Sequence, residues 1–174
     1  VINKMDSAKK EDIELVKANV KRLNPNAVVI EADSELSIGD KDILKDKKVL
    51  IVEDGPTLTH GEMKTGAAKV AVERFGKNTT MIEPKQYAVG KLKETYAKYT
   101  NIDKNILPAM GYGIQQVKDL QETINNAVAD LVVSGTPIDL GRIVKVNKPI
   151  IKIGYELKER KGSTGKMEKA IKKL

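Results

Sequence analysis

The stretch Lys48-Val49-Leu50-Ile51-Val52-Glu53-Asp54-Gly55-Pro56 decides the fold class of this chain. Its apolar run of Val, Leu and Ile is typical of a strand buried on both faces. The Asp-Gly-Pro that follows predicts a turn. Helical spacing of apolar residues then predicts a helix from about Gly61 to Phe75, ended by Gly76. The stretch therefore predicts a strand, a turn and a covering helix.

Strands and helices are expected to alternate along the rest of the chain. Strands are expected at residues 27–30, 79–83, 106–110, 130–133 and 149–155, and helices at residues 7–22, 88–99, 114–127 and 138–144. This alternation predicts an α/β fold of three layers, a mostly parallel sheet with helices on both faces. Ligands in such folds bind beyond the carboxyl ends of the strands, so functional residues are expected in those loops.

Composition restricts the class of function. The chain has no Cys, which excludes disulfides, zinc-thiolate sites and cysteine nucleophiles. Its richness in Lys and Glu fits a cytosolic protein of a thermophile. The net charge is +7, but the lysines are mixed with acidic residues and aromatic residues make up only 3%. Side chains that could stack on bases are thus scarce, so the sequence argues against nucleic acid and favours phosphorylated small molecules.

Changes in composition divide the chain into three expected parts. Residues 1–46 are expected to end a nucleotide-binding domain, residues 47–157 to form an α/β segment that binds a phosphorylated substrate, and residues 158–174 to form a flexible basic tail. Val1 lies inside an expected strand, which favours a fragment whose phosphate-binding half lies upstream. No apolar run spans a bilayer and no signal peptide is present, so we expect a cytoplasmic protein without membrane contact.

The first residues, Val1-Ile2-Asn3-Lys4-Met5-Asp6, join an apolar strand end to the pattern Asn-Lys-x-Asp. In this pattern the Asp carboxylate accepts two N–H bonds from guanine and the Lys stem lies along the base. A second base-contacting loop is expected about one αβ unit later, at residues 31–34. The predicted nucleotide-binding residues are Asn3, Lys4, Asp6 and, through its backbone, Ala32. The alternative is a strand-to-helix turn capped by Asp6 or Ser7.

The phosphate-binding loop G-x-x-x-x-G-K-[ST] is absent from the sequence. Residues 162–166 are similar to it, but Arg160 stands where its first Gly is needed and Met167 where Ser or Thr is needed. The nucleotide phosphates are therefore expected to be bound by an upstream segment or another chain.

The densest set of functional side chains is at residues 53–61, after the central strand. The loop carries two carboxylates, two Thr hydroxyls and the only His of the chain. We expect Asp54 to orient a nucleophile or to hold Mg²⁺, and His60 to move a proton. Thr57 and Thr59 are expected to bind phosphate beside the N-terminus of the next helix. The alternative is an Asp-Gly turn with a Thr or His cap.

Three further loops carry groups suited to anions. Gly111 and Gly113 allow a backbone to approach a ligand closely, although a tight turn explains them as well. Thr136 and Arg142 can bind phosphate through a hydroxyl and a guanidinium, the alternative being a capped helix with a surface Arg. Lys85 can neutralise an anion. Because these loops follow parallel strands, they are predicted to form one rim.

Three motifs resemble the C-terminal half of an archaeal and bacterial family described as predicted P-loop GTPases or cyclic 2,3-diphosphoglycerate synthetase-like proteins. They are Val-Glu-Asp-Gly-Pro-Thr-Leu-Thr-His-Gly at 52–61, Leu-Pro-Ala-Met-Gly-Tyr-Gly at 107–113 and Gly-Thr-Pro-Ile-Asp-Leu at 135–140. The resemblance implies a P-loop NTPase-like half that continues into a second α/β segment. It also implies phosphoryl transfer with Mg²⁺ and ATP or GTP, in which a phosphoanhydride closes within 2,3-diphosphoglycerate.

The sequence thus leads to two hypotheses of function. The first is a nucleotide-dependent phosphoryl-transfer enzyme, similar to cyclic 2,3-diphosphoglycerate synthetase, that acts on a small phosphorylated acid and is active only as the full-length chain. The alternative is a GTP-binding switch or GTPase-like protein with little turnover. A third reading makes the isolated chain an inactive structural half. Both a monomer and a homodimer agree with the sequence.

Overall fold

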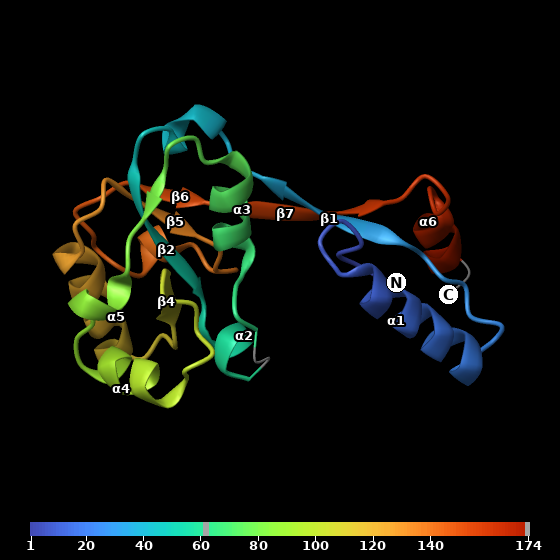
Figure 1. Ribbon diagram of the computed structural model, residues 1–174, viewed down its shortest axis with the longest axis horizontal. Helices are drawn as coiled ribbons and strands as arrows, with labels where there is room; N and C mark the ends of the chain where they lie inside the picture. The colour runs from blue at the N-terminus through green and yellow to red at the C-terminus, as the bar shows by residue number, and fades with distance from the viewer. Residues whose placement is uncertain (61–62, 173–174) are drawn as a thin grey trace. The chain divides into compact units, whose positions relative to one another are not determined.

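The computed structural model describes residues 1–60 and 63–172. Its contacts divide the chain into two compact units, one made of Val1–Leu36 with Tyr155–Leu174 and one of Ser37–Gly154 (Figure 1). The domain limits expected from composition, after residues 46 and 157, stay predictions. The two units are described one after the other.

The second unit is built on a five-stranded sheet with β2 (Lys48–Asp54) at its centre. On one side β2 pairs with β3 (Thr80–Met81) and, further along, with β4 (Ile106–Ala109). On its other side lies β5 (Leu131–Ser134), which pairs with β6 (Ile150–Lys152). All these pairings are parallel, as predicted.

Helices cover both faces of this sheet, so the three-layer α/β class is confirmed (Figure 1). The α-helices of the unit are α2 (Gly55–Thr59), α3 (Ala67–Phe75), α4 (Lys91–Lys98) and α5 (Ile114–Asn126), and its 3-10 helices are η1 (Lys41–Leu44), η2 (Pro84–Tyr87) and η3 (Leu140–Arg142). In Figure 1, α3 lies on one side of the strands and α4 and α5 on the other. No helix within the described residues combines the length and the apolar character that crossing a bilayer requires.

The core of the second unit forms around β2. Residues Val49, Leu50, Ile51 and Val52 have no exposed surface. Burial of each such side chain stabilises the fold by about 1.5–3 kcal/mol. Small residues of α3 pack on one face, and Leu120 and Ile124 are the largest buried apolar residues of α5. The apolar run that predicts a doubly buried strand is therefore buried as expected.

The helix predicted from Gly61 to Phe75 is shorter than expected. A separate short helix, α2, begins directly after Asp54, whose carboxylate accepts a hydrogen bond from the Thr57 N–H, with Pro56 in its first turn. Such a start suits Pro, which lacks the N–H that the first turn leaves unpaired. Helix α3 begins only at Ala67, and Met63, which lies within the predicted helix range, is exposed and outside any helix. Gly61 lies outside the described residues.

The first unit contains α1 (Lys10–Leu23) and α6 (Lys166–Ile171), and its two-stranded sheet is formed by β1 (Ala32–Ser37) and β7 (Gly154–Glu159). The strand predicted at 27–30 is wrong, since Val28 is 68% exposed and the strand begins at Ala32. Ala32 is the first residue of β1, the strand that pairs with β7.

Two other predictions about this unit are also wrong. Neither Asp6 nor Ser7 caps α1, because the N-cap is Lys9, which makes no side-chain cap bond. The expected flexible tail instead contains the end of β7 and helix α6. It is tied to the unit by the Arg160 N–H, which donates to the carbonyl of Glu31 at 2.9 Å.

Candidate functional site

The carboxyl ends of β2, β4 and β5 lie side by side at one edge of the sheet. Asp54 is opposite Ala109 in β4, and Val52 is opposite Ser134 in β5. The loops that follow the three strands therefore start from neighbouring positions, as predicted for parallel strands. The chain moves from β2 to β3 and β4 on one side, and then crosses to β5 on the other. The topological switch point of the sheet, where the strand order reverses, therefore lies between the carboxyl ends of β2 and β5.

The Glu53 carboxylate is buried at this switch point. Three backbone N–H groups at the start of α3 donate to it, and they belong to Gly66, Ala68 and Lys69. Glu53 is only 2% exposed. A Cβ atom on Gly135 would lie 2.2 Å from Glu53 Oε2, so the first residue after β5 has to be Gly for the carboxylate to fit.

The pKa of Glu53 is raised to about 7. Burial is the largest cause, because a buried site disfavours the charged form, and the neighbouring Asp54 charge raises the pKa further. The hydrogen bonds from α3 act in the opposite direction and only partly offset burial. Sequence reasoning did not select Glu53 as a site residue, although an acidic residue that ends an apolar strand was a usable signal.

The side chains of Asp54, Thr57 and Thr59 make hydrogen bonds within the first loop itself. Asp54 Oδ2 accepts from the Thr57 N–H at 3.2 Å and from its hydroxyl at 2.7 Å. The Thr59 hydroxyl donates to the carbonyl of Gly55 at 3.1 Å. These contacts form a capped turn, but the cap is Asp54 and not the Thr or His of the alternative. A phosphate that bound Thr57 or Thr59 would have to replace them.

His60 is exposed and ends α2. The expectation that it stands at the start of a helix is wrong, because the next helix in the described residues starts at Ala67. The positive end of that helix is occupied by the Glu53 carboxylate. The anion site expected beside His60 is therefore already occupied by a side chain of the chain itself.

The loop after β4 holds Gly111 and Gly113. The Gly113 N–H donates to the Gln116 side chain at 3.4 Å, and a Cβ on Gly111 would lie 2.7 Å from the same Gln116 oxygen. The space that the glycines leave is thus taken by Gln116. The neighbouring Tyr112 side chain has a raised pKa, first through burial and then through the charge of Asp54, so the loops after β2 and β4 approach each other.

The remaining rim residues differ in exposure. The Thr136 hydroxyl is buried, contacts the Ser134 hydroxyl at 3.0 Å and donates to the carbonyl of Ile138 at 2.9 Å. The Arg142 side chain is 86% exposed and pairs with Asp139 at 3.2 Å. Lys85 lies exposed in η2. The Thr136 hydroxyl is thus engaged in hydrogen bonds within the fold, whereas Arg142 and Lys85 lie on the surface.

The two predicted base-contacting loops meet in the first unit. Ile2 and Glu31 form an isolated parallel bridge, and α1 lies between them in the sequence, so the two segments meet across one helix as the spacing predicted, although neither bridge residue belongs to a strand. The Ser34 N–H donates to Asp6 Oδ1 at 3.0 Å. The Asp that was predicted to bind guanine therefore lies against the second loop.

Ala32 is fully buried and both of its backbone groups are engaged. Its N–H donates to the carbonyl of Ile2 at 2.9 Å, and its carbonyl accepts from the Met5 N–H at 3.1 Å. A base that used the Ala32 N–H would have to replace the first of these bonds. Asn3 and Lys4 are exposed in the turn before α1. Their nucleotide roles stay predictions.

The predicted Mg²⁺ ligand, Asp54, belongs to no group of three possible metal ligands in the part of the chain that the structure describes. Within residues 1–60 and 63–172, no three His, Cys, Asp or Glu side chains gather closely enough to hold a metal ion. A site made only by protein ligands is therefore not present there. Mg²⁺ in phosphoryl-transfer enzymes is commonly bound by one or two carboxylates together with substrate phosphates, and Asp54 fits only that arrangement.

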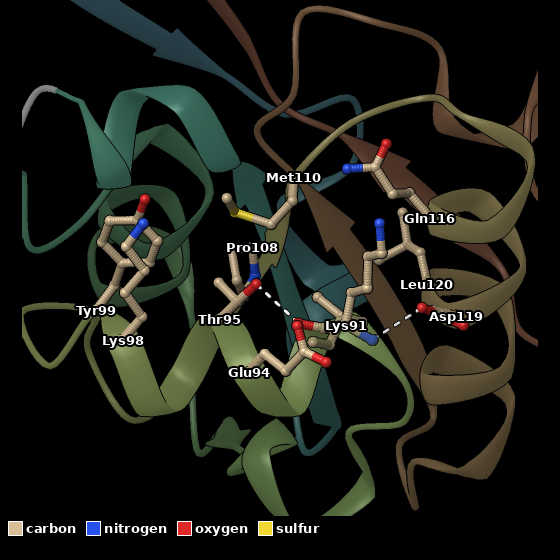
Figure 2. Close-up of a pocket in the computed structure, with 11 residues that line it drawn as sticks. Lys91, Glu94, Thr95, Lys98, Tyr99, Pro108, Met110, Gln116, Asp119 and Leu120 are labelled. Carbon is tan, nitrogen blue, oxygen red and sulfur yellow. Dashed lines mark hydrogen bonds between the residues drawn. The ribbon is translucent and has the colours of Figure 1, made fainter.

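A cavity of about 190 Å³ lies between α4 and α5, beyond the carboxyl end of β4 (Figure 2). We call it the α4–α5 pocket, and the lining residues that matter below are Lys91, Glu94, Lys98, Met110, Gln116 and Asp119. Loop motifs could not have found this pocket. A usable signal was the charged series at i, i+3 and i+7 on one face of α4.

Comparison with known proteins gives one similarity and one negative result. No protein-family model matches the chain. The chain is 52% identical over 159 residues to arginine synthetase ArcE of Thermococcus kodakarensis, an alignment that covers 91% of this chain and 35% of that protein. The chain spans about a third of the length of this curated relative. It is thus related to an archaeal synthetase, and the cyclic 2,3-diphosphoglycerate family is not named by the comparison.

Proposed function

We propose that this chain is part of a nucleotide-dependent synthetase that forms arginine. The observation that carries the proposal is the 52% identity to an arginine synthetase across 91% of the chain. Two features of the structure support it. A parallel sheet with three loops at one edge is a common place for a substrate site, and the first unit brings two predicted base-contacting loops together.

The nucleotide, ATP or GTP, is proposed to bind through Asn3, Lys4 and Asp6 of the first unit, with its phosphates held by an upstream segment or another chain. Asp54 is proposed to supply the one carboxylate that Mg²⁺ needs beside the phosphates. Its Oδ2 atom caps α2, so its other oxygen is the one proposed for the ion. Phosphoryl transfer depends mainly on positioning and charge neutralisation, so no covalent nucleophile is required.

The chemistry of a guanidinium group explains why a nucleotide is needed. When a ureido carbonyl oxygen takes a phosphoryl group from the nucleotide, it becomes a good leaving group. Ammonia then attacks the carbon, the C–N bond forms, and the C–O bond breaks as phosphate leaves. A nucleoside triphosphate is converted to diphosphate and phosphate, and the ammonia has to lose a proton. His60, exposed on the rim, is proposed to accept it.

A second candidate is the cyclic 2,3-diphosphoglycerate synthetase-like activity. The motif at 52–61 favours it, because it is long and resembles that family. The rim as folded supports it less, since Arg142 already pairs with Asp139 and the Thr136 hydroxyl is buried. A highly charged phosphorylated acid requires several free cations, and phosphate oxygens are best matched by Arg side chains.

The test is to assay the full-length protein with Mg²⁺ and ATP or GTP. One reaction contains ammonia and the ureido amino acid citrulline, and the other contains 2,3-diphosphoglycerate. Arginine formed in step with nucleoside diphosphate supports the proposal, while a cyclic phosphoanhydride product supports the second candidate. Nucleotide hydrolysis that neither substrate changes favours the GTPase-like alternative and contradicts both.

A further inference from the structure

The α4–α5 pocket presents charged groups that the fold does not use. No hydrogen bond or ion pair within the described residues engages the Lys91 ammonium or the Glu94 carboxylate, and both line the pocket. Lys98 Nζ lies 5.1 Å from the centre of the Tyr99 ring at the other end of the same helix face. The rim differs in this respect, because its carboxylates and hydroxyls bond to neighbouring groups of the chain.

The wall that carries these charges is held in place by a buried carboxylate. Asp119 of α5 is 4% exposed and accepts from the Lys91 backbone N–H at 3.0 Å and from Gln115 at 2.8 Å. Gly90 has a φ of 51°, and a Cβ there would lie 2.3 Å from Asp119 Oδ2, so the chain comes as close to the carboxylate as Gly allows. The start of α4 is thus fixed on α5 before any ligand binds, which lowers the cost of binding.

The arrangement of polar and apolar groups indicates a type of ligand. Lys91 and Glu94 are neighbours on one helix face, so a cation and an anion stand about one turn apart. Met110 and Leu120 supply apolar surface from β4's end and from α5. Figure 2 shows the Lys91 side chain extending between Met110 and Gln116, with Glu94 on the same helix, α4. A molecule with a carboxylate, an aliphatic stem and a cationic end matches this set.

We propose that the α4–α5 pocket binds the free amino acid of the reaction, with its α-carboxylate at Lys91 and its guanidinium or ureido end at Glu94. The choice of arginine and its ureido precursor rests on the proposed function, whereas the zwitterionic character of the ligand rests on the pocket alone. The cavity of about 190 Å³ is smaller than the roughly 300–1,000 Å³ of drug-sized sites. It therefore suits an amino acid and leaves the nucleotide to the first unit.

The test measures equilibrium binding of L-arginine to the full-length protein by calorimetry, with and without Mg²⁺ and nucleotide. Lys91→Met keeps the stem of the side chain and removes its charge, and Glu94→Gln removes the negative charge. Both side chains are exposed, so both variants should fold. Each lost charge-assisted bond should weaken arginine binding about tenfold or more. Lys93→Met is the matched control, since Lys93 is also exposed on α4 but does not line the pocket, and it should bind arginine normally.

Ligands that lack one end of arginine show which side chain binds the carboxylate and which binds the guanidinium. Agmatine, which has no carboxylate, should bind equally to the unmodified protein and to Lys91→Met. Norvaline, which has no guanidinium, should bind equally to the unmodified protein and to Glu94→Gln. No arginine binding, or equal weakening by Lys91→Met and Lys93→Met, contradicts the pocket assignment.

The pocket and the proposed function can fail separately. If the enzyme forms arginine but Lys91→Met leaves the KM for the amino acid unchanged, the pocket assignment is wrong and the proposed function stands. If arginine binds with the expected variant effects but no synthesis occurs, the pocket is an amino-acid site and the synthetase proposal is wrong.

Discussion

The rim at the ends of β2 and β5 and the α4–α5 pocket lie in the same unit but use their polar groups differently. At the rim, the Glu53 carboxylate is held by the backbone of α3 and the Thr136 hydroxyl by the carbonyl of Ile138. In the pocket, the Lys91 ammonium and the Glu94 carboxylate have no partner among the described residues. A dense motif can therefore serve mainly to hold loops together, while an ordinary charged helix face remains available to a ligand.

The largest effect is expected from the charge of Glu53. Its pKa is raised from 4.5 to about 7 in the folded protein, so the folded state binds the proton more tightly than the unfolded state. Stability from this group is fully present below about pH 4.5 and is lost as the pH rises toward 7, by about 3 kcal/mol. Thermal unfolding from pH 4.5 to 8 should show this loss. Glu53→Gln carries no charge at any pH, so its own pH dependence should be smaller by that amount. Parallel curves for the two proteins would contradict the burial of an ionisable Glu53.

A somewhat smaller loss is expected from Gly135→Ala. The new Cβ would lie 2.2 Å from Glu53 Oε2 and 2.8 Å from the Ala68 backbone nitrogen, so part of the rim has to move. Such overpacking should lower the free energy of unfolding by about 2 kcal/mol. Urea denaturation measures it. Gly141→Ala is the control, because its Cβ would meet Asp139 only at 3.4 Å, and it should be nearly neutral.

Two variants of Asp54 distinguish its role as the cap of α2 from its proposed role as a Mg²⁺ ligand. Asp54→Ala removes the cap of α2 and should cost about 1 kcal/mol of stability, whereas Asp54→Ser keeps a capping oxygen and should cost much less. If Asp54 also binds Mg²⁺, both variants of the full-length enzyme should lose turnover about tenfold or more, because Ser is a poor Mg²⁺ ligand. Normal turnover in Asp54→Ser would leave Asp54 only as a cap.

The smallest effect is expected from Arg142→Ala. This side chain is 86% exposed and its pair with Asp139 is screened by water, so stability should change by no more than about 0.5 kcal/mol. Arginine synthesis by the full-length enzyme should also stay unchanged. A large loss of turnover with normal stability would mean that the rim binds a phosphorylated substrate after all, and would favour the second candidate function.

The sequence was sufficient to predict the parallel sheet and the common edge of its loops. The run Val49–Val52 is apolar at every position, and this alone requires burial on both faces. The Asn-Lys-x-Asp turn and residues 31–34 were also expected one αβ unit apart, and they do meet.

The partners of single side chains could not be predicted in the same way. Whether the Thr57 hydroxyl faces solvent or Asp54 depends on where α2 begins, and the helix signal pointed to Gly61 instead. The place of Glu53 depends on α3 and Gly135, which are far apart in the sequence. The α4–α5 pocket depends on how two helices pack, and no local motif reports that.

Hydrogen exchange of the full-length protein, with and without L-arginine, compares the two regions directly. The account predicts that arginine slows exchange in α4 and α5 and leaves the loop at 135–142 unchanged. Slower exchange confined to that loop, with α4 and α5 unaffected, would contradict it and place the amino acid at the rim.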